Sequence, residues 1–401
     1  MTDHPVSIDT RLVHIGSDPR QQHGFVNPPI YRASTALYED TASMEAAQSD
    51  PLKRGTPVYG RFGTPTTRAF ESALADLEGG HGAVATCSGL AAITTAIMAF
   101  VSAGDHILIS DSAYLPTRKF CDSLSRFGVE AEYYPPCLGR EIEELIRPAT
   151  RLVYLESPGS NTFEVQDVPA IATLCRTRGV ITIVDNTWAT PAFHRPLELS
   201  ADVVLQSATK YLTGHADSIL GAVVCTKGTF DLVRSTAIRL GQCASADEAY
   251  LGLRGLRTLS VRLRQHQRQG MELACWLREQ EEVSGVIYPA LPDDPGHELW
   301  RRDFAGAPGL FGLELSPRFS PAAVDRMLGA LRLFGMGHSY GGYESLIVPS
   351  DAVTHRLPGT WEERGPLLRV HVGFEDIGDL KADLASGLRA LSSLQPRSCP
   401  T

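Results

Sequence analysis

The sequence predicts an α/β protein with a mostly parallel sheet of seven strands, a smaller α/β domain after it and an extended arm before it. From about residue 63, short apolar runs alternate with helix-like segments, which is typical of βαβ units. Polar residues follow several of these runs, and ligands of parallel sheets lie at the carboxyl ends of the strands. With 401 residues the chain is long enough for two sizeable cores.

Residues 1–62 predict an arm rather than a domain. They lack strong periodicity and contain turn-forming stretches such as Pro28-Pro29 and Gly55-Thr56-Pro57. Such a segment has no core of its own, so we expect it to pack on another surface.

The hydrophobic pattern also indicates where the helices and strands of the two domains lie. Residues 66–77 have the spacing of an amphipathic helix, and the stretch 253–279 predicts one long arginine-rich helix. We place the larger domain at 63–258 and the C-terminal domain at 259–401. The seven strands are expected at Ala83–Thr86, His106–Ser110, Glu130–Tyr134, Leu152–Leu155, Val180–Val184, Val203–Gln206 and Ala222–Cys225.

Composition argues against several classes of function. A net charge of −9 and a pI of about 5.8 disfavour nucleic acid or an anionic membrane as the main partner. The eight cysteines form no CxxC pair, and no Cys/His spacing predicts a metal site. The first residues lack an apolar signal core, and no segment approaches the length of a membrane span. We therefore expect a cytoplasmic protein with reduced thiols.

Lys210 and Asp185 are the most informative pair of residues. Each follows or ends a short apolar run, and Lys210 is flanked by the hydroxyls of Ser207 and Thr209. An enzyme that uses pyridoxal phosphate needs a lysine that forms a Schiff base with the cofactor aldehyde. It also needs an aspartate that keeps the pyridine nitrogen protonated. The two hydroxyls can donate to the cofactor phosphate, so this pattern predicts a pyridoxal phosphate site.

Two segments near the strand ends have a functional and an ordinary interpretation. Ser88, Gly89 and Leu90 lie between a strand and a helix, where small residues let backbone N–H groups approach a phosphate. The same stretch also suits an ordinary strand–helix turn. Tyr114 can stack on the cofactor ring, or it can be a rim tyrosine that packs on its own domain.

Three arginine-containing segments also leave two interpretations open. Arg61, at the end of the arm, can bind a phosphate through its planar fork or lie in a surface loop. Arg369 stands in an apolar stretch and needs a partner, which is either a substrate α-carboxylate or an internal carboxylate. The arginine-rich stretch 254–268 predicts a solvated helix face rather than a nucleic-acid site.

Together these residues resemble the cysteine/methionine-metabolism (trans-sulfuration) family of fold-type I pyridoxal phosphate enzymes. The resemblance covers nearly the whole chain and implies a transferase-like fold. Its motifs are specific for the family in this combination. They lie at 27–31, 59–61, 156–160, 185–188, 207–211 and 368–376.

The resemblance implies roles position by position. Lys210 would carry the cofactor and move protons, while Tyr114 would stack on the ring and help deprotonate the incoming amine. Asp185 would pair with the pyridine nitrogen. The phosphate would be held by Ser88, Gly89, Leu90, Ser207 and Thr209, and across the subunit boundary by Tyr59 and Arg61. The substrate would be bound by Arg369 and Ser339 at its α-carboxylate, with Tyr59 and Tyr340 beside it.

The same resemblance implies a homo-oligomer, a tetramer built from dimers with shared sites, and favours a carbon–sulfur β-lyase. Related γ-enzymes tend to place a glutamate directly before the serine at 339, where this chain has His338. The expected reaction is β-elimination of L-cystathionine or a related S-substituted cysteine to a thiol, pyruvate and ammonia. A γ-lyase or γ-synthase is the alternative. A cofactor-binding regulator without catalysis is more remote, because Lys210, Tyr114 and Arg369 are all retained.

Overall fold

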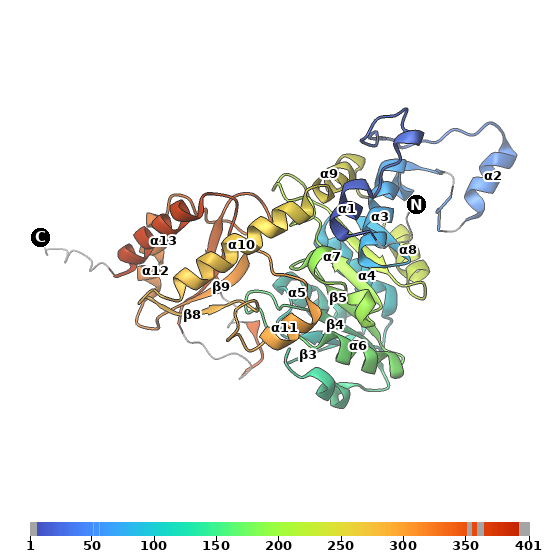
Figure 1. Ribbon diagram of the computed structural model, residues 1–401. Helices are drawn as coiled ribbons and strands as arrows, with labels where there is room; N and C mark the ends of the chain where they lie inside the picture. Colours follow the sequence, from blue (N-terminus) through green and yellow to red (C-terminus); the bar gives the residue numbers. More distant parts are fainter. Residues whose placement is uncertain (1–5, 51, 56, 351–354, 359–364, 393–401) are drawn as a thin grey trace, which may run out of the picture.

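The computed structural model describes residues 6–50, 52–55, 57–350, 355–358 and 365–392 (Figure 1). Its larger sheet has the strand order β1-β7-β6-β5-β4-β2-β3. Strand β7 is antiparallel to both neighbours and every other pair is parallel. The strands are β1 (Gly82–Thr86), β2 (His106–Ser110), β3 (Glu130–Tyr134), β4 (Thr150–Glu156), β5 (Ile181–Asp185), β6 (Val203–Gln206) and β7 (Gly221–Cys225). The predicted seven-stranded, mostly parallel sheet is confirmed.

Helices cover both faces of this sheet, which explains why its strands are apolar throughout. One face packs against α4 (Gly89–Phe100), α5 (Leu115–Ser123) and α8 (Phe230–Arg239). The other face packs against α3 (Pro65–Glu78), α6 (Val168–Thr177) and α9 (Ala246–Leu256). Shorter helices in the connections are α7 (Thr190–Phe193), η3 (Leu124–Phe127), η4 (Gly139–Leu145) and η5 (Pro196–Leu199).

A second, smaller domain contains an antiparallel sheet of order β10-β11-β9-β8. Its elements are α10 (Leu259–Leu277), β8 (Val283–Ile287), α11 (His297–Asp303), β9 (Leu310–Leu315), α12 (Pro321–Ala330), β10 (Leu346–Pro349), β11 (Leu367–His371) and α13 (Ile377–Ser392). Helices α10, α12 and α13 share one apolar core with this sheet. Figure 1 shows α10 running from the larger sheet's helices to the second sheet, so it joins the two domains.

The predicted single helix over 253–279 is wrong. Helix α9 ends at Leu256 and α10 begins at Leu259. The end of α9 passes very close to the chain after Lys210, because a side-chain carbon at Gly255 would meet the carbonyl of Leu212. This close approach is a tertiary constraint that helical periodicity does not contain.

The prediction of a solvated arginine face is correct only in part. Arg254, Arg264 and Arg268 are exposed, whereas Arg262 is buried. The guanidinium of Arg262 donates to main-chain carbonyls instead of facing water. A buried guanidinium that finds several carbonyl acceptors is stable without a carboxylate partner.

The N-terminal arm carries short helices, α1 (Ile8–His14), η1 (Pro19–Gln21), α2 (Thr41–Ser49) and η2 (Gly60–Phe62). Figure 1 shows α2 at the outer end of an excursion away from the sheet. Large apolar side chains of the arm are exposed, with Phe25 at 73%, Val26 at 75% and Leu37 at 91%. The arm therefore presents an apolar surface that this chain does not cover.

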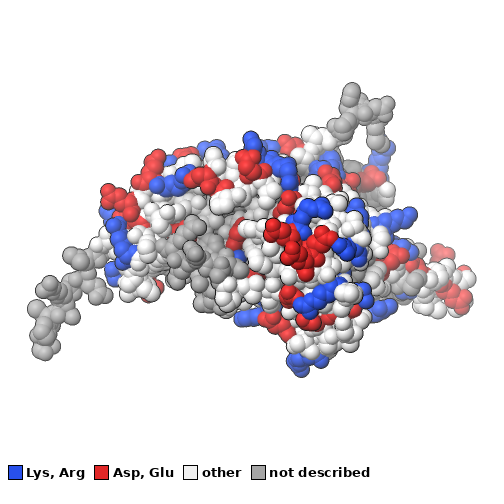
Figure 2. All heavy atoms as spheres, turned by 90° about the horizontal axis from the view of Figure 1, so that it is seen from below, with Lys and Arg blue, Asp and Glu red and all other residues white. Residues whose placement is uncertain are grey.

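The surface carries both signs of charge. On the face in Figure 2 the described basic and acidic side chains are interspersed. Among the described residues, no helix combines the length and the apolar character needed to cross a membrane.

Asp383 on α13 stabilises the chain that leads into the substrate side of the site. Its two carboxylate oxygens accept the backbone N–H groups of Arg332, Leu333 and Phe334 at 2.9–3.2 Å. We expect Asp383→Asn to lower the free energy of unfolding by about 1–3 kcal/mol, because the amide has only one acceptor oxygen. Urea denaturation of the cofactor-free protein measures this change.

The matched control is Asp325→Asn, which removes the same charge from an exposed position of α12. Equal stability of the two variants would contradict the role given to Asp383.

Candidate active site

A cavity of about 390 Å³ lies at the carboxyl ends of β4, β5 and β6. The larger domain supplies most of its wall, and the second domain closes one side with Ser339, Tyr340 and Arg369. The sequence-predicted residues that line it are Ser88, Gly89, Leu90, Tyr114, Asp185, Ser207, Thr209, Lys210, Ser339, Tyr340 and Arg369. The tertiary structure therefore brings together positions that lie far apart in the chain, from 88 to 369.

The turn that carries Lys210 is held from behind by Arg262. Its guanidinium donates to the carbonyl oxygen of Tyr211 at 2.6 Å and to that of Leu212 at 3.2 Å. Gly214 follows with a φ of +73°, and a side chain there would collide with Arg262. The turn after β6 is thus locked into one conformation that directs Lys210 into the cavity.

The amine of Lys210 has no carboxylate partner among the described residues. Its Nζ donates to the Oγ of Ser339 at 2.8 Å and lies 4.9 Å from the ring centroid of Tyr340. Burial, and then the positive charge of Arg369, lower the pKa of Lys210 to about 8. Much of the amine is therefore neutral near pH 8, the form that attacks an aldehyde and accepts a proton.

Asp185 and Glu156 lie side by side at the ends of β5 and β4, where they are paired in register. Asp185 accepts hydrogen bonds from the backbone N–H of Thr187 at 3.0 Å and from the Tyr154 hydroxyl at 3.3 Å. Burial raises the pKa of Asp185, and burial together with Asp185 raises the pKa of Glu156. Two adjacent buried carboxylates favour a cationic or proton-bearing partner in the cavity.

The start of α4 forms a cradle against the turn after β6. Ser88 caps this helix, its Oγ accepting the N–H of Ala91 at 3.1 Å. A side-chain carbon at Gly89 would lie 2.6 Å from the Cβ of Ser207, so only glycine permits this approach. The hydroxyl of Thr209 meanwhile donates to the carbonyl of Leu220 at 3.1 Å. Gly89, Leu90 and Ser207 line the cavity at the first turn of α4, where the backbone N–H groups of a helix lack intrahelical partners and can bind an anion.

Tyr114 stands at the start of α5 and is 45% exposed. Its backbone N–H donates to Glu156 at 2.7 Å. The residue lines the cavity, so the sequence-based alternative of a tyrosine that only packs on its own domain does not describe its position. Two basic residues, Arg118 and Lys119, follow shortly after Tyr114 in the sequence; Lys119 is exposed and does not line the cavity.

Arg369 lies in the middle of β11 with its guanidinium directed at the cavity. One nitrogen donates to the carbonyl oxygen of Ser339 at 3.2 Å, and the guanidinium carbon is 6.0 Å from the Tyr340 ring centroid. Among the described residues Arg369 forms no ion pair. The sequence allowed an internal carboxylate as its partner, and none of the described carboxylates takes that place. Burial lowers the pKa of Arg369, yet it remains a cation suited to a carboxylate.

Tyr59 and Arg61 do not reach the cavity of their own chain. Both belong to the arm, where the Arg61 guanidinium stacks 4.4 Å from the Phe62 ring centroid. Tyr59 is 43% exposed. Neither residue lines the cavity that holds Lys210 in the same chain.

Sequence reasoning missed three residues of the site as functional candidates. Glu156 ends an apolar run as Asp185 does, so the same signal could have identified it. Trp188 lines the cavity and donates to the Leu310 carbonyl at 3.1 Å, and its place in the family motif at 185–188 is the signal that could have identified it. Arg262 lies in the same arginine-rich stretch as several exposed arginines, so the sequence pattern did not distinguish it from them.

The cavity fits pyridoxal phosphate. A buried amine with a lowered pKa suits the aldehyde, and a buried carboxylate pair without a described cationic partner suits a protonated pyridine nitrogen. The glycine-lined cradle at the start of α4 suits the phosphate. Sheet order and donor set together define a class, the enzymes that depend on pyridoxal phosphate.

Comparison with known proteins narrows this class. The chain belongs to the Cys/Met metabolism PLP-dependent enzyme family, which it matches over residues 9–389. It is 44% identical to a putative cystathionine beta-lyase of Rhizobium johnstonii, covering 96% of this chain and 97% of that protein. It is 41% identical to the cystathionine beta-lyase of Escherichia coli K12, covering 95% and 98%. The crystal structure of cystathionine gamma synthase from Xanthomonas oryzae pv. oryzae superposes with a TM-score of 0.88 at 31% identity, covering 97% and 99%.

The lowered pKa of Lys210 predicts how the cofactor-free protein takes up pyridoxal phosphate. Only the neutral amine attacks the aldehyde, so the rate should rise with pH and level off above the pKa of about 8. Stopped-flow absorbance of the mixing reaction measures this rate, and Lys210→Ala provides the blank. With an ordinary lysine, whose pKa is about 10.4, the rate of cofactor uptake would still be rising near pH 10. Such a pH profile would contradict the site geometry.

Proposed function

We propose that this enzyme is a carbon–sulfur β-lyase that converts L-cystathionine or a related S-substituted cysteine to a thiol, pyruvate and ammonia. The observation that carries the proposal is the direct contact between Lys210 and Ser339, whose carbonyl oxygen binds Arg369. We call Arg369 and Ser339 the carboxylate clamp. Ser339 thereby joins this clamp to the base, Lys210. A substrate carboxylate on Arg369 would place the Cα–H bond beside the Lys210 amine.

β-Elimination needs one deprotonation at Cα and a leaving group at Cβ. Lys210 would remove the Cα proton, and the C–S bond would break as the thiolate leaves. Tyr114, on the rim of the cavity, would orient the substrate. Burial and the nearby Glu156 raise the pKa of its hydroxyl, so this group would stay protonated. When bound, pyridoxal phosphate supplies the electron-accepting ring that stabilises charge at Cα. Asp185 would hold the proton on the ring nitrogen.

The relatives support β over γ chemistry. The putative and the named cystathionine beta-lyase are 44% and 41% identical to this chain, whereas a cystathionine gamma-synthase of Mycobacterium bovis is 36% identical and the γ-synthase of known structure 31%. γ-Chemistry requires further proton transfers at Cβ, and the residue directly before Ser339 is the exposed His338 rather than a glutamate. A γ-lyase or γ-synthase remains the second candidate, because the fold and cofactor site serve both reactions.

Product analysis distinguishes the two candidates. With L-cystathionine we expect homocysteine and pyruvate in excess over cysteine and 2-oxobutyrate, because Lys210 is placed for a single proton removal at Cα. Chromatography of the ketoacid products from purified holoenzyme measures the ratio. Lys210→Ala should lose nearly all turnover while remaining folded, which shows that the products come from this site. Predominant 2-oxobutyrate would assign the chain to γ-chemistry.

We further propose that the protein is a homo-oligomer in the cytoplasm, a tetramer built from two dimers. Residues 1–62 would form an arm that reaches the neighbouring subunit's site, 63–258 the cofactor domain and 259–401 the C-terminal domain. The exposed apolar arm and the position of Tyr59 and Arg61 outside their own cavity support the shared site. Seven described cysteines are free, which suits a reducing compartment.

Subunit mixing tests the shared site. If Arg61 completes a neighbour's phosphate site, hybrids of Arg61→Ala and Lys210→Ala protomers contain sites in which both residues are intact. Activity should then exceed that of either variant alone after dissociation and reassociation. A mixture of Lys210→Ala with Asp185→Ala is the matched control, since both residues belong to one chain's cavity and no hybrid site is whole. Failure of the first mixture to exceed the control would place Arg61 in its own chain's site.

A further inference from the structure

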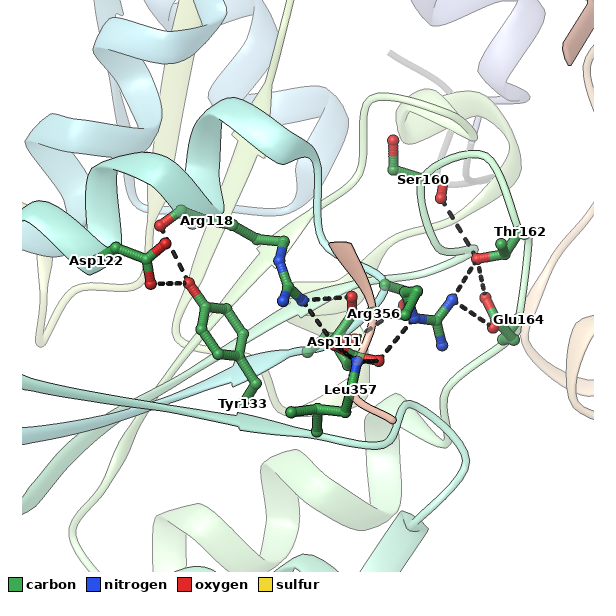
Figure 3. A network of polar contacts seen from close by, with 11 residues as sticks. Asp111, Arg118, Asp122, Tyr133, Ser160, Thr162, Glu164, Arg356 and Leu357 are labelled. Atoms are coloured by element: carbon green, nitrogen blue, oxygen red, sulfur yellow. Dashed lines mark hydrogen bonds and ion pairs between the residues drawn. The ribbon is translucent and has the colours of Figure 1, made fainter. Parts of the chain in front are cut away.

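Arg356 connects the second domain to the larger domain at the edge of the cavity (Figure 3). It lies in the described segment 355–358 between β10 and β11, and its side chain is 5% exposed. Its Nε donates to Asp111 at 2.7 Å, and one terminal nitrogen donates to Thr162 at 2.7 Å and to Glu164 at 2.9 Å. One guanidinium therefore binds two separate loops of the larger domain.

The first of these loops leads directly to Tyr114. Asp111 follows β2 and its carboxylate is fully buried. It accepts hydrogen bonds from Arg356, from the backbone N–H of Leu357 at 3.0 Å, and from Arg118 at 2.7 Å. Figure 3 shows the guanidinium groups of Arg118 and Arg356 converging on this carboxylate. The turn that begins α5 is thus held from two sides, three residues before Tyr114.

The second loop carries another part of the cavity wall. Thr162 donates to Glu164 at 2.5 Å, and both bind Arg356. The backbone N–H of Ser160 donates to the carbonyl of Ser112 at 2.8 Å, which joins this loop to the turn after β2. Ser160 lines the cavity, so the contacts of Arg356 reach the wall through the two loops that it binds.

A smaller cavity of about 190 Å³ continues from the main one along Arg356. It shares Tyr114, Ser160 and Arg369 with the main cavity. Arg356 therefore lines the smaller cavity, into which the S-substituent of a substrate bound at Arg369 would extend. Its described hydrogen bonds go to the two loops and to neither Lys210 nor Arg369, so we expect Arg356 to act on the base and on the α-carboxylate site through these loops.

We propose that Arg356 is a positioning residue that fixes the second domain, with its carboxylate clamp, against the larger domain, with its lysine and stacking tyrosine. This inference rests on the proposed function for the identity of the substrate. Arg369 and Ser339 belong to the second domain, whereas Lys210 and Tyr114 belong to the larger one. A shift between the domains would separate the α-carboxylate site from the base, and small displacements of this kind are costly in catalysis.

The chemistry of arginine suits this role. Its planar fork donates along several directions at once, whereas the lysine ammonium is a point charge that cannot span Asp111 and the Thr162–Glu164 pair in the same way. Burial by itself lowers the pKa of Arg356, but Glu164 and Asp111 more than offset it and the pKa is raised. The side chain stays charged at every pH at which the enzyme is assayed.

The test compares substrate binding with turnover in the holoenzyme. Arg356→Lys and Arg356→Ala should raise KM by roughly tenfold or more, with a smaller change in kcat, since breaking a buried ion pair loosens the domain contact. Thr162→Val is a milder variant that removes the hydroxyl and keeps the shape, and it should raise KM in the same direction. Absorbance of the bound cofactor should be unchanged, because Arg356 lies outside its pocket.

The matched control is Arg302→Ala. Arg302 of α11 also pairs with a carboxylate of the larger domain, Asp167 at 2.7 Å, but that carboxylate does not line the main or the smaller cavity. Its loss should leave KM unchanged. Equal KM values for wild type, both Arg356 variants and Thr162→Val, with folding verified by circular dichroism, would overturn the proposal.

A binding measurement separates this proposal from the proposed function. Titration of the holoenzyme with glycine, which carries the α-amine and α-carboxylate but no leaving group, changes the cofactor absorbance on binding. Its Kd should rise in the Arg356 variants even if the chain turns out to perform γ-chemistry. An unchanged glycine Kd would contradict the positioning role, whatever products the enzyme forms.

Discussion

The alignment of strand ends at β4, β5 and β6 is the constraint on which the rest of the site depends. Parallel pairing places Glu156 of β4 opposite Asp185 of β5. Lys210 lies in the turn that follows the next strand, β6, at the same edge of the sheet. Side chains that follow parallel strands must therefore share one cavity. The energetic consequence is that a buried aspartate and a partly buried glutamate line the same cavity as a partly buried amine and guanidinium, each with a shifted pKa.

The second domain supplies the substrate-binding side chains that the edge of the larger sheet lacks. Arg369 and Ser339 come from β11 and from the loop before β10, and Ser339 connects the clamp to the lysine by hydrogen bonds. Backbone contacts support this loop, since the N–H of Gly341 donates to the buried His371 at 3.1 Å. Burial holds the pKa of His371 well below its usual range, so its ring stays neutral, and its Nε2 lies 3.1 Å from both the Gly341 nitrogen and the Gly342 carbonyl oxygen. Substrate binding is thus a property of the domain contact.

Two arginines outside the cavity organise it from opposite sides. Arg262 binds the carbonyl oxygens that follow Lys210, and Arg356 binds the loops that lead to Tyr114 and Ser160. Both are buried, and both use the several donors of the guanidinium group to join chain segments far apart in sequence. The reactive groups are consequently presented by turns that these two guanidinium groups hold through hydrogen bonds.

The sequence by itself determined the seven strands, the polar residues at their ends and the pairing of Lys210 with Asp185, because strand periodicity and strand-end chemistry are local signals. It also marked Gly89, Tyr114 and Arg369, each with an ordinary interpretation that only the structure could set aside. The tertiary structure decided the break between α9 and α10, the burial of Arg262 and the contacts of Arg356. All three features depend on close approaches between segments that are distant in the sequence. Helical spacing cannot distinguish an arginine that is solvated from one that binds a main-chain carbonyl.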